Sequence, residues 1–378
     1  MTIQSSKVWH NERFHPLRIE IEDGIITGIH SHDRSMVDED YGDAMIIPGM
    51  VDIHAHGYMG SDCNHATCEW LSKWVNYYPT EGVTSIAATT SSVNEELLLR
   101  SMDTIATFME TPHAGANILG IYAEGPLLNT KFKGAQSIDA IVKPSVEVLK
   151  KYEKASKGKL VYCCIAPEID DGLVAVKYAA SRGIRVAIGH SEASLDICRD
   201  AKNAGVCSFT HVFNGMPGLH HRKPGPVGAA MYFDDMYAEI IGDGTHVDMA
   251  VVRIFGNIKG KDRLILVSDS AQSKGLSPGE HNLPGRHVFL DEHGVAKLSN
   301  GTIAGGSGKM NELLRNLVEK AALDEVTAIN AATCNPLKML GLADCKGYIA
   351  VGYDADIAVL AHDYTVVQTL VRGKKQIT

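Results

Sequence analysis

Eight short apolar segments are spaced along the chain, and each of them ends in polar residues. They are rich in Ile, Val and Leu, and the stretches between them are long enough to hold a helix. This alternation predicts β/α repetition around a buried parallel sheet. The segments are residues 45–53, 84–88, 118–123, 160–166, 185–188, 206–209, 238–241 and 263–267. Eight such units predict an α/β fold whose architecture is a (β/α)₈, TIM-like barrel.

Helical patterns fill several of the gaps between these segments. Apolar residues recur at helical spacing over residues 94–110, 146–156, 173–182 and 310–322. Each of these stretches follows an apolar segment, as the crossover helix of a β/α unit does. We therefore expect a helix in each of the four.

The polar residues that end the apolar segments are mostly imidazoles and carboxylates. In a (β/α)₈ barrel, the carboxyl ends of the strands form one face, and that face carries the active site. A group of histidines and carboxylates gathered there predicts a metal site. The residues concerned are Asp52, His54, His56, Thr89, Thr90, Glu124, Glu168, His190, His211, Asp243, His246 and Asp269.

The composition excludes several classes of protein. The chain has 378 residues and a formal net charge of -9, which argues against nucleic-acid binding because phosphate contacts need a basic face. No apolar stretch approaches the length of a membrane span, and residues 1–11 contain no signal-peptide core. The cysteines form no CxxC pair and lie mostly in apolar segments, which predicts reduced thiols and a cytoplasmic location.

Both ends of the chain differ from the middle in their hydrophobic pattern. Short alternating segments occur at residues 17–21 and 24–29 and again at 355–360 and 365–371, with turn signals at 22–24 and 372–373. Pairing of the two ends would form a small β-sandwich domain from residues 1–47 and 347–378. Residues 48–346 would then form the barrel.

His54 and His56 lie two residues apart at the end of the first segment. Side chains at this spacing on a strand face the same side, so the two imidazoles can chelate a metal ion at little entropic cost. The spacing alone is a weak signal, because surface and core histidines show it as often. Their place at a strand end favours ligation.

Glu124 ends the third segment, and His190 and His211 end two consecutive later ones. A carboxylate at that place would bind or bridge metal ions, whereas a helix-capping or surface glutamate is the alternative. A single strand-end histidine is more often structural than a ligand. Two of them, together with Glu124, favour a metal site.

Asp269 and His246 end the last two segments. An aspartate beside an activated water can take its proton and return it to a leaving group, unless it serves only as a ligand or structural acceptor. His246 could donate a hydrogen bond to a developing oxyanion, or it could merely line the pocket.

A basic cluster, His220-His221-Arg222-Lys223, follows the sixth segment and precedes Pro224-Gly225. Charge runs are usually solvated, yet this run lies on the catalytic side of an acidic chain. The forked guanidinium of Arg222 suits a phosphate, so we expect a phosphate anchor there, to which Lys131 and Lys133 could add.

Seven motifs along the chain form an ordered set. They are Pro48-Gly49-Met50-Val51-Asp52-Ile53-His54-Ala55-His56-Gly57, Ala123-Glu124-Gly125-Pro126, Lys133-Gly134-Ala135, Gly189-His190-Ser191, Thr210-His211-Val212-Phe213-Asn214-Gly215-Met216, Asp243-Gly244-Thr245-His246-Val247 and Ser268-Asp269. In this order and spacing, the chain resembles the N-acetylglucosamine-6-phosphate deacetylases of the amidohydrolase superfamily over nearly its whole length.

The resemblance implies a metal-dependent hydrolase of amino-sugar catabolism that converts N-acetyl-D-glucosamine 6-phosphate to D-glucosamine 6-phosphate and acetate. The metal ligands that it implies are Glu124, His190 and His211, with His54, His56 and Glu124 as ligands of a second ion. It implies that Asp269 is the general acid/base and is assisted by His246. The residues that it implies as contacts of the sugar phosphate are Ala135, Asn214, Gly215, Arg222 and His246, and the residues that it implies as pocket lining are Ile303 and Ala304.

The resemblance also bears on cofactor and assembly. The mixed carboxylate and imidazole donors predict Zn²⁺ or Fe²⁺, with one or two ions per subunit. The resemblance implies a homodimer or a higher homo-oligomer, in which the loop of Arg222 could reach a neighbour's site. Residues 163–168 include no lysine, which disfavours a dinuclear site built on a carbamylated lysine.

Four residues near the expected substrate depart from the pattern of the family. Gly306, Gly308 and Lys309 stand where relatives tend to carry a Ser, an apolar residue and a Thr, and Lys223 stands where a Glu is common. Two alternatives therefore stay open: a deacetylase for N-acetylgalactosamine 6-phosphate or another phosphorylated N-acyl amino sugar, and a non-catalytic sugar-phosphate sensor. Asp269 argues against the sensor, because binding alone needs no proton shuttle.

Overall fold

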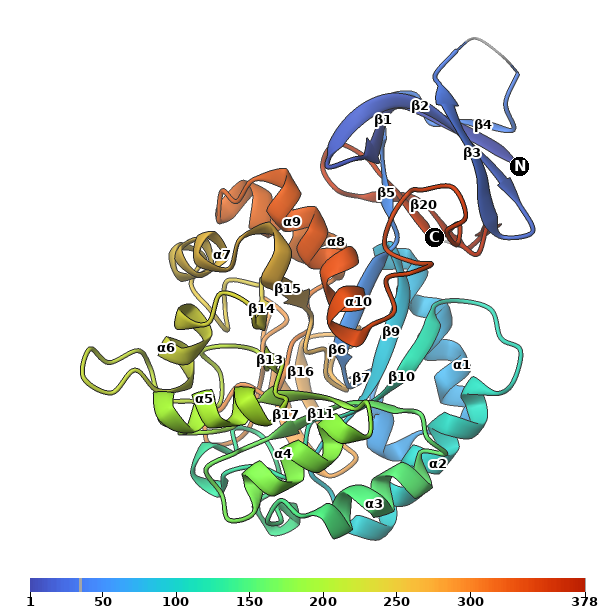
Figure 1. Cartoon of the computed structure of the whole chain (residues 1–378). Helices are drawn as coiled ribbons and strands as arrows, with labels where there is room; N and C mark the ends of the chain where they lie inside the picture. Colours follow the sequence, from blue (N-terminus) through green and yellow to red (C-terminus); the bar gives the residue numbers. More distant parts are fainter. Residues whose placement is uncertain (34–35, 378) are drawn as a thin grey trace.

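The computed structural model describes residues 1–33 and 36–377 and confirms the (β/α)₈ barrel. Eight parallel strands follow one another around the barrel in chain order (Figure 1). They are β6 (Met50–Ala55), β9 (Val83–Thr90), β10 (Asn117–Ala123), β11 (Leu160–Ile165), β12 (Arg185–Ile188), β13 (Ser208–Phe209), β14 (Tyr237–Ile241) and β15 (Leu264–Val267). A parallel bridge between Ala55 and Ser270 brings the last strand to the first, so the barrel is nearly closed.

Helices surround the barrel and cover its outer, apolar face (Figure 1). Those after successive strands are α1 (Cys68–Tyr77), α2 (Glu95–Met109), α3 (Val146–Ala155), α4 (Gly172–Ser181), α5 (Leu195–Ala204), α6 (Gly225–Tyr232), α7 (Met249–Arg263) and α8 (Met310–Arg315), followed by α9 (Glu325–Ala332) and α10 (Cys334–Leu340). Side chains of Asn94 and Ser145 cap α2 and α3 by accepting from backbone N–H groups. All four expected helices are confirmed, although the last ends its α-helical part at Arg315 and continues as the π-helical turn Asn316–Lys320.

The first apolar segment, residues 45–53, is two strands rather than the single barrel strand expected. β5 (Met45–Pro48) belongs to another sheet, and the barrel begins at β6. Gly49 marks the crossing: its N–H donates to the carbonyl of Asp356, and a Cβ there would lie 2.3 Å from the side chain of Thr84. The apolar run is continuous, but its first part packs in the core of the terminal sheet and its second part in the core of the barrel. Hydrophobicity alone therefore does not reveal where one strand ends and the next begins.

The two ends of the chain form one hydrogen-bonded sheet beside the barrel (Figure 1). Its order is β21 (Lys374–Lys375), β20 (Val366–Val371), β19 (Ile357–Leu360), β5, β1 (Thr2–His10), β2 (Arg13–Glu22) and β3 (Ile25–Ser31), with β4 (Glu39–Asp40) beside β1. Its core includes Ile3, Ile19, Ile46 and Val359. The expected strand-rich module from both termini is confirmed, and its boundaries at residues 47 and 347 stay a prediction.

A three-stranded antiparallel sheet after β15 was not expected from the sequence. It consists of β16 (Gly279–Leu283), β17 (Arg286–Leu290) and β18 (Ala296–Lys297). A short ribbon, β7 (Gly57–Tyr58) and β8 (Ser61–Asp62), follows β6. Both additions lie in loops at the carboxyl ends of barrel strands, where they border the candidate site. Within the described residues, none of the helices has both the length and the apolar character that crossing a membrane requires.

Candidate active site

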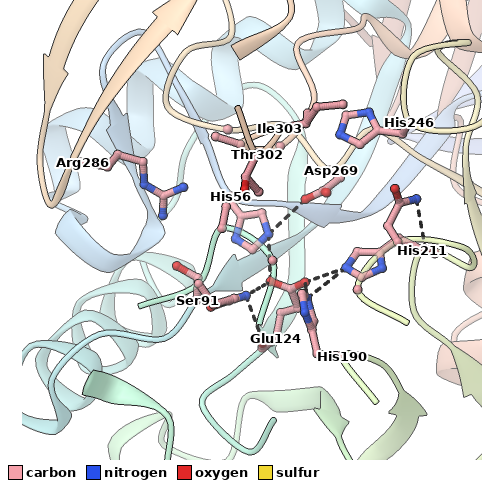
Figure 2. Close-up of a pocket in the computed structure, with 18 of the residues that line it drawn as sticks. His56, Ser91, Glu124, His190, His211, His246, Asp269, Arg286, Thr302 and Ile303 are labelled. Atoms are coloured by element: carbon pink, nitrogen blue, oxygen red, sulfur yellow. Dashed lines mark hydrogen bonds and ion pairs between the residues drawn. The ribbon is translucent and has the colours of Figure 1, made fainter. Parts of the chain in front are cut away.

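A cavity of about 300 Å³ opens at the carboxyl ends of the barrel strands (Figure 2). Its lining brings together most of the predicted site residues, contributed by loops after different strands. These are His56, Glu124, Ala135, His190, His211, Asn214, Gly215, His246, Asp269, Ile303 and Ala304. His54 is fully buried beside them, and Arg222 does not line this cavity.

Glu124, His190 and His211 form one group of converging ligand atoms. Oε1 of Glu124 lies 2.9 Å from Nε2 of His190 and 2.9 Å from Nε2 of His211. The two Nε2 atoms are 3.2 Å apart. All three residues are buried, with at most 5% of their surface exposed. The ends of three barrel strands thus direct their donor atoms to one buried position.

His54, His56 and Glu124 form a second such group, which shares the glutamate with the first. Nε2 of His54 lies 3.2 Å from Nε2 of His56, and Oε2 of Glu124 lies 3.4 Å from the latter. Asp269 adjoins this group: its Oδ1 lies 3.5 Å and 3.3 Å from the Nε2 atoms of His54 and His56.

The hydrogen bonds of the other ring nitrogens test whether these histidines suit a metal ion. Nδ1 of His190 lies 2.7 Å from the carbonyl of Phe132, Nδ1 of His56 lies 3.1 Å from the carbonyl of Thr89, and Nδ1 of His54 lies 2.8 Å from Oε2 of Glu239. A carbonyl or carboxylate can only accept, so each Nδ1 carries the proton and, in a neutral ring, Nε2 offers a lone pair. Two facing lone pairs repel, and a cation between them removes the repulsion. These three histidines therefore fit a divalent cation, whereas Nδ1 of His211 is buried without a hydrogen-bond partner among the described residues.

The electrostatics of the site favour positive charge within it, carried either by protonated imidazoles or by a bound cation. Burial raises the pKa of Glu124, but the nearby imidazoles of His190 and His211 outweigh burial and hold that pKa well below its usual range. Burial lowers the pKa of His54, yet the carboxylates of Glu239 and Asp269 raise it well above its ordinary value. Burial also opposes ionisation of Asp269, but the charges of His54 and His56 lower its pKa to about 2. The carboxylates thus stay ionised and attract positive charge.

Three of these residues have strained backbones. His190, His211 and Asp269 have φ angles of 48°, 25° and 47°, in the left-handed region that residues with a Cβ rarely adopt. Each follows the last residues of a barrel strand. Strain of this kind persists where the surrounding structure enforces it, and it concentrates at functional sites.

Gly215 permits the close packing of the loop after β13 against His190. Its φ is 62°, and a Cβ there would lie 2.7 Å from Nδ1 of His190. Its carbonyl accepts a hydrogen bond from the N–H of Ser191. A residue with a side chain at this position would displace the imidazole, so the glycine is required by the site.

His246 is paired with Asp243, three residues before it. Nδ1 of His246 lies 2.6 Å from Oδ2 of Asp243, whose Oδ1 accepts from the N–H of His246 at 2.9 Å. Burial lowers the pKa of His246, but the hydrogen bond and charge of Asp243 outweigh burial and raise it. The carboxylate fixes the ring so that Nε2 is the nitrogen free to face the cavity.

The candidates from the sequence that lie outside the cavity lining include Glu168, Lys131, Lys133 and Arg222. Glu168 accepts hydrogen bonds from Asn129, Ser191 and the N–H of Glu192, which makes it a structural acceptor. Lys131 pairs with Glu192 at 2.6 Å, and Lys133 donates to backbone carbonyls. Arg222 lies on an exposed loop, where its guanidinium lies 3.0 Å from His221.

Several residues of the site were missed in the sequence, among them Glu239, Gln136 and Arg286. Glu239 orients His54; its signal is a charge inside the apolar segment 238–241. Gln136 donates to the Glu124 carboxylate and accepts from the N–H of Ser92 at 2.6 Å. Arg286 lines the cavity from β17, and no motif in the sequence points to it.

Comparisons with known proteins agree with this geometry. The sequence profile of the amidohydrolase family matches residues 45–375. N-acetylglucosamine-6-phosphate deacetylase of Bacillus subtilis (strain 168) is 34% identical over 88% of this chain and 84% of its own, and N-acetylgalactosamine-6-phosphate deacetylase of Escherichia coli O157:H7 is 31% identical over 94% of both. The crystal structure of N-acetyl-D-glucosamine-6-phosphate deacetylase from Mycobacterium smegmatis superposes with a TM-score of 0.94 at 30% identity and covers 100% of both chains. The chain belongs to the amidohydrolase family.

Proposed function

We propose that this protein hydrolyses the acetamide group of N-acetyl-D-glucosamine 6-phosphate, releasing acetate and D-glucosamine 6-phosphate. One observation carries the proposal: a single cavity holds the carboxylate of Asp269 next to the converging donors of Glu124, His190 and His211. The name of the similar Bacillus subtilis protein supports this substrate. The proposed reaction belongs to the catabolism of amino sugars.

Glu124, His190 and His211 would hold one divalent cation, Zn²⁺ or Fe²⁺, and His54 and His56 with Glu124 would hold a second. Mixed carboxylate and imidazole donors suit both metals. A cation bound there would polarise the amide carbonyl as a Lewis acid and make the attacking water more acidic.

Asp269 moves the proton in this mechanism. Its carboxylate, ionised at neutral pH, accepts a proton from the water whose oxygen attacks the acetyl carbonyl carbon. As the C–N bond breaks, Asp269 returns the proton to the departing amine nitrogen. His246, held by Asp243, donates a hydrogen bond to the carbonyl oxygen as negative charge develops on it.

The remaining lining residues would hold the sugar. Ala135, Asn214, Gly215, Ile303 and Ala304 border the same cavity as Asp269 and offer backbone groups and apolar contacts to a sugar ring. Because the Arg222 loop lies outside the cavity of its own chain, we also propose a homodimer or higher homo-oligomer in which this loop reaches a neighbouring site. The free and mostly buried cysteines support a cytoplasmic location.

The experiment that tests the proposal measures release of acetate from N-acetylglucosamine 6-phosphate by the purified protein, with metal analysis of the same sample. We expect stoichiometric acetate and glucosamine 6-phosphate, and loss of activity after exhaustive chelation that added Zn²⁺ or Fe²⁺ restores. Full activity in metal-free protein would refute the metal site. Tight binding of the sugar phosphate without turnover would instead identify a sensor.

N-acetylgalactosamine 6-phosphate is the second candidate substrate. The similar Escherichia coli O157:H7 protein carries that activity in its name, at an identity within a few per cent of the first relative. The two sugars differ only in the orientation of one hydroxyl group. Comparing kcat/KM for both epimers in one preparation decides between them, and we expect the glucosamine epimer to be preferred.

A further inference from the structure

Arg286 brings an uncompensated positive charge to the cavity. It is partly buried and lies at the start of β17, and Figure 2 shows it on one side of the cavity with His246 on the other. In the part of the chain that the structure describes, its guanidinium has no hydrogen-bonding or ion-pair partner. A partly buried guanidinium without a partner loses hydration for no return, unless a ligand supplies the missing anion.

Charge balance in the cavity suggests what that ligand is. Three carboxylates, those of Asp62, Glu124 and Asp269, line the same space, and Arg286 is the one lysine or arginine among the described residues of the lining. Cations held by the two ligand groups would balance the nearby carboxylates, so the phosphate group of a substrate would need a separate positively charged partner. We infer that Arg286 binds the phosphate group of the substrate in its own subunit and determines the preference for phosphorylated sugars.

Hydrogen bonds connect the β16–β17 hairpin to the loops at the carboxyl ends of the barrel strands, and they hold Arg286 in position. Nε2 of Gln272, in the loop after β15, donates to the carbonyl of Pro284 at 3.1 Å and to Oδ2 of Asp62 at 2.8 Å. Gln272 is only 2% exposed. Arg286 is two residues beyond Pro284 and pairs with Leu283 across the turn. A planar guanidinium can donate two parallel hydrogen bonds to two phosphate oxygens in a fixed geometry, whereas the ammonium group of a lysine acts as a point charge without that geometry.

Arg286 and Arg222 have different surroundings. Arg222 lies on an exposed loop outside the cavity of its own chain, whereas Arg286 already lines it. A phosphate contact by Arg286 therefore needs no second subunit. Any contribution from a neighbour's Arg222 would add to it.

This inference rests on the proposed function, and its test uses Arg286→Gln, Arg286→Lys and the control His287→Gln in the full-length, metal-loaded protein. His287 is the exposed neighbour on the same strand and does not line the cavity. We expect Arg286→Gln to raise KM for N-acetylglucosamine 6-phosphate by about ten- to a hundredfold, the effect of removing a charged hydrogen-bond partner. The ratio of kcat/KM for the phosphorylated to the unphosphorylated sugar should fall in parallel. Arg286→Lys should fall between Arg286→Gln and wild type, and His287→Gln should keep the wild-type ratio.

An unchanged ratio in Arg286→Gln, or equal losses on both sugars, would overturn the inference and make Arg286 structural. A second measurement, the binding of inorganic phosphate by calorimetry, separates this outcome from failure of the proposed function. If wild type releases no acetate from either sugar, the proposed function fails. Phosphate binding that Arg286→Gln weakens would still support the anchor, and phosphate binding that the substitution leaves unchanged would overturn it.

Discussion

Oε2 of Glu239 lies 2.8 Å from Nδ1 of His54, although 185 residues separate the two in the chain. Both side chains are completely buried. The same carboxylate accepts from the hydroxyl of Tyr162 at 2.8 Å and from the N–H of His211 at 3.1 Å. A single glutamate, which we do not propose as a ligand, thus orients a histidine from each of the two candidate metal groups.

We predict that Glu239→Gln weakens metal binding by about ten- to a hundredfold, the usual effect of removing a carboxylate that orients a ligating histidine. Titration of the metal-free protein against a competing chelator measures the affinity. Tyr162→Phe is the matched control, because it removes one hydrogen bond from Glu239 and leaves the contact with His54 in place. Equal metal affinities in wild type and Glu239→Gln would show that Glu239 only supports packing.

Asp269→Asn should lower kcat by at least about a hundredfold, because the amide cannot accept a proton at neutral pH. The substitution preserves the size and shape of the side chain, so metal content should stay near that of wild type. Steady-state kinetics and metal analysis of one preparation check both points. A variant that retains its metal and turns over within a few-fold of wild type would contradict the role of Asp269 and move attention to His246, since Glu168 is occupied by structural hydrogen bonds.

Mixing of variant subunits tests whether Arg222 acts in the site of a neighbouring subunit. If its loop completes a neighbour's site, Arg222→Ala and Asp269→Asn homo-oligomers are both impaired, but in a mixed dimer one site has both residues intact. For random pairing, about a quarter of wild-type activity should return. Co-expression with two different affinity tags allows the mixed dimer to be isolated and assayed. Absence of any recovery would place Arg222 in its own subunit's site or in a structural role.

Asp243→Asn should shift the alkaline limb of the pH profile of kcat/KM to lower pH. Burial lowers the pKa of His246, and Asp243 raises it by more, so the ring stays protonated to a higher pH than an ordinary histidine. The contribution of the protonated ring is complete below that pKa and is lost as pH rises through it. Without the carboxylate, the loss begins at lower pH. A profile that does not move would show that the proton on His246 is not needed.

Much of the candidate site follows from the sequence alone. The apolar segments have strand length and helix-sized spacing, and parallel strands present their carboxyl ends at one face. His56, Glu124, His190, His211 and Asp269 therefore meet in one cavity, as expected from their places at segment ends. The hydrophobic periodicity of a segment and the position of a polar residue at its end are local properties of the sequence. They can therefore be recognised without a structure.

Tertiary structure alone decided the rest. The contact between Glu239 and His54 joins distant strands across the barrel interior, and no local pattern encodes which buried carboxylate meets which imidazole. The break at Gly49 depends on a carbonyl in the C-terminal module. Arg286 reaches the cavity because a hairpin folds back and is tied down by Gln272, whereas Arg222, with the stronger motif, lies outside. Each of these depends on how separate elements pack together, and packing is set by the whole fold rather than by neighbours in the sequence.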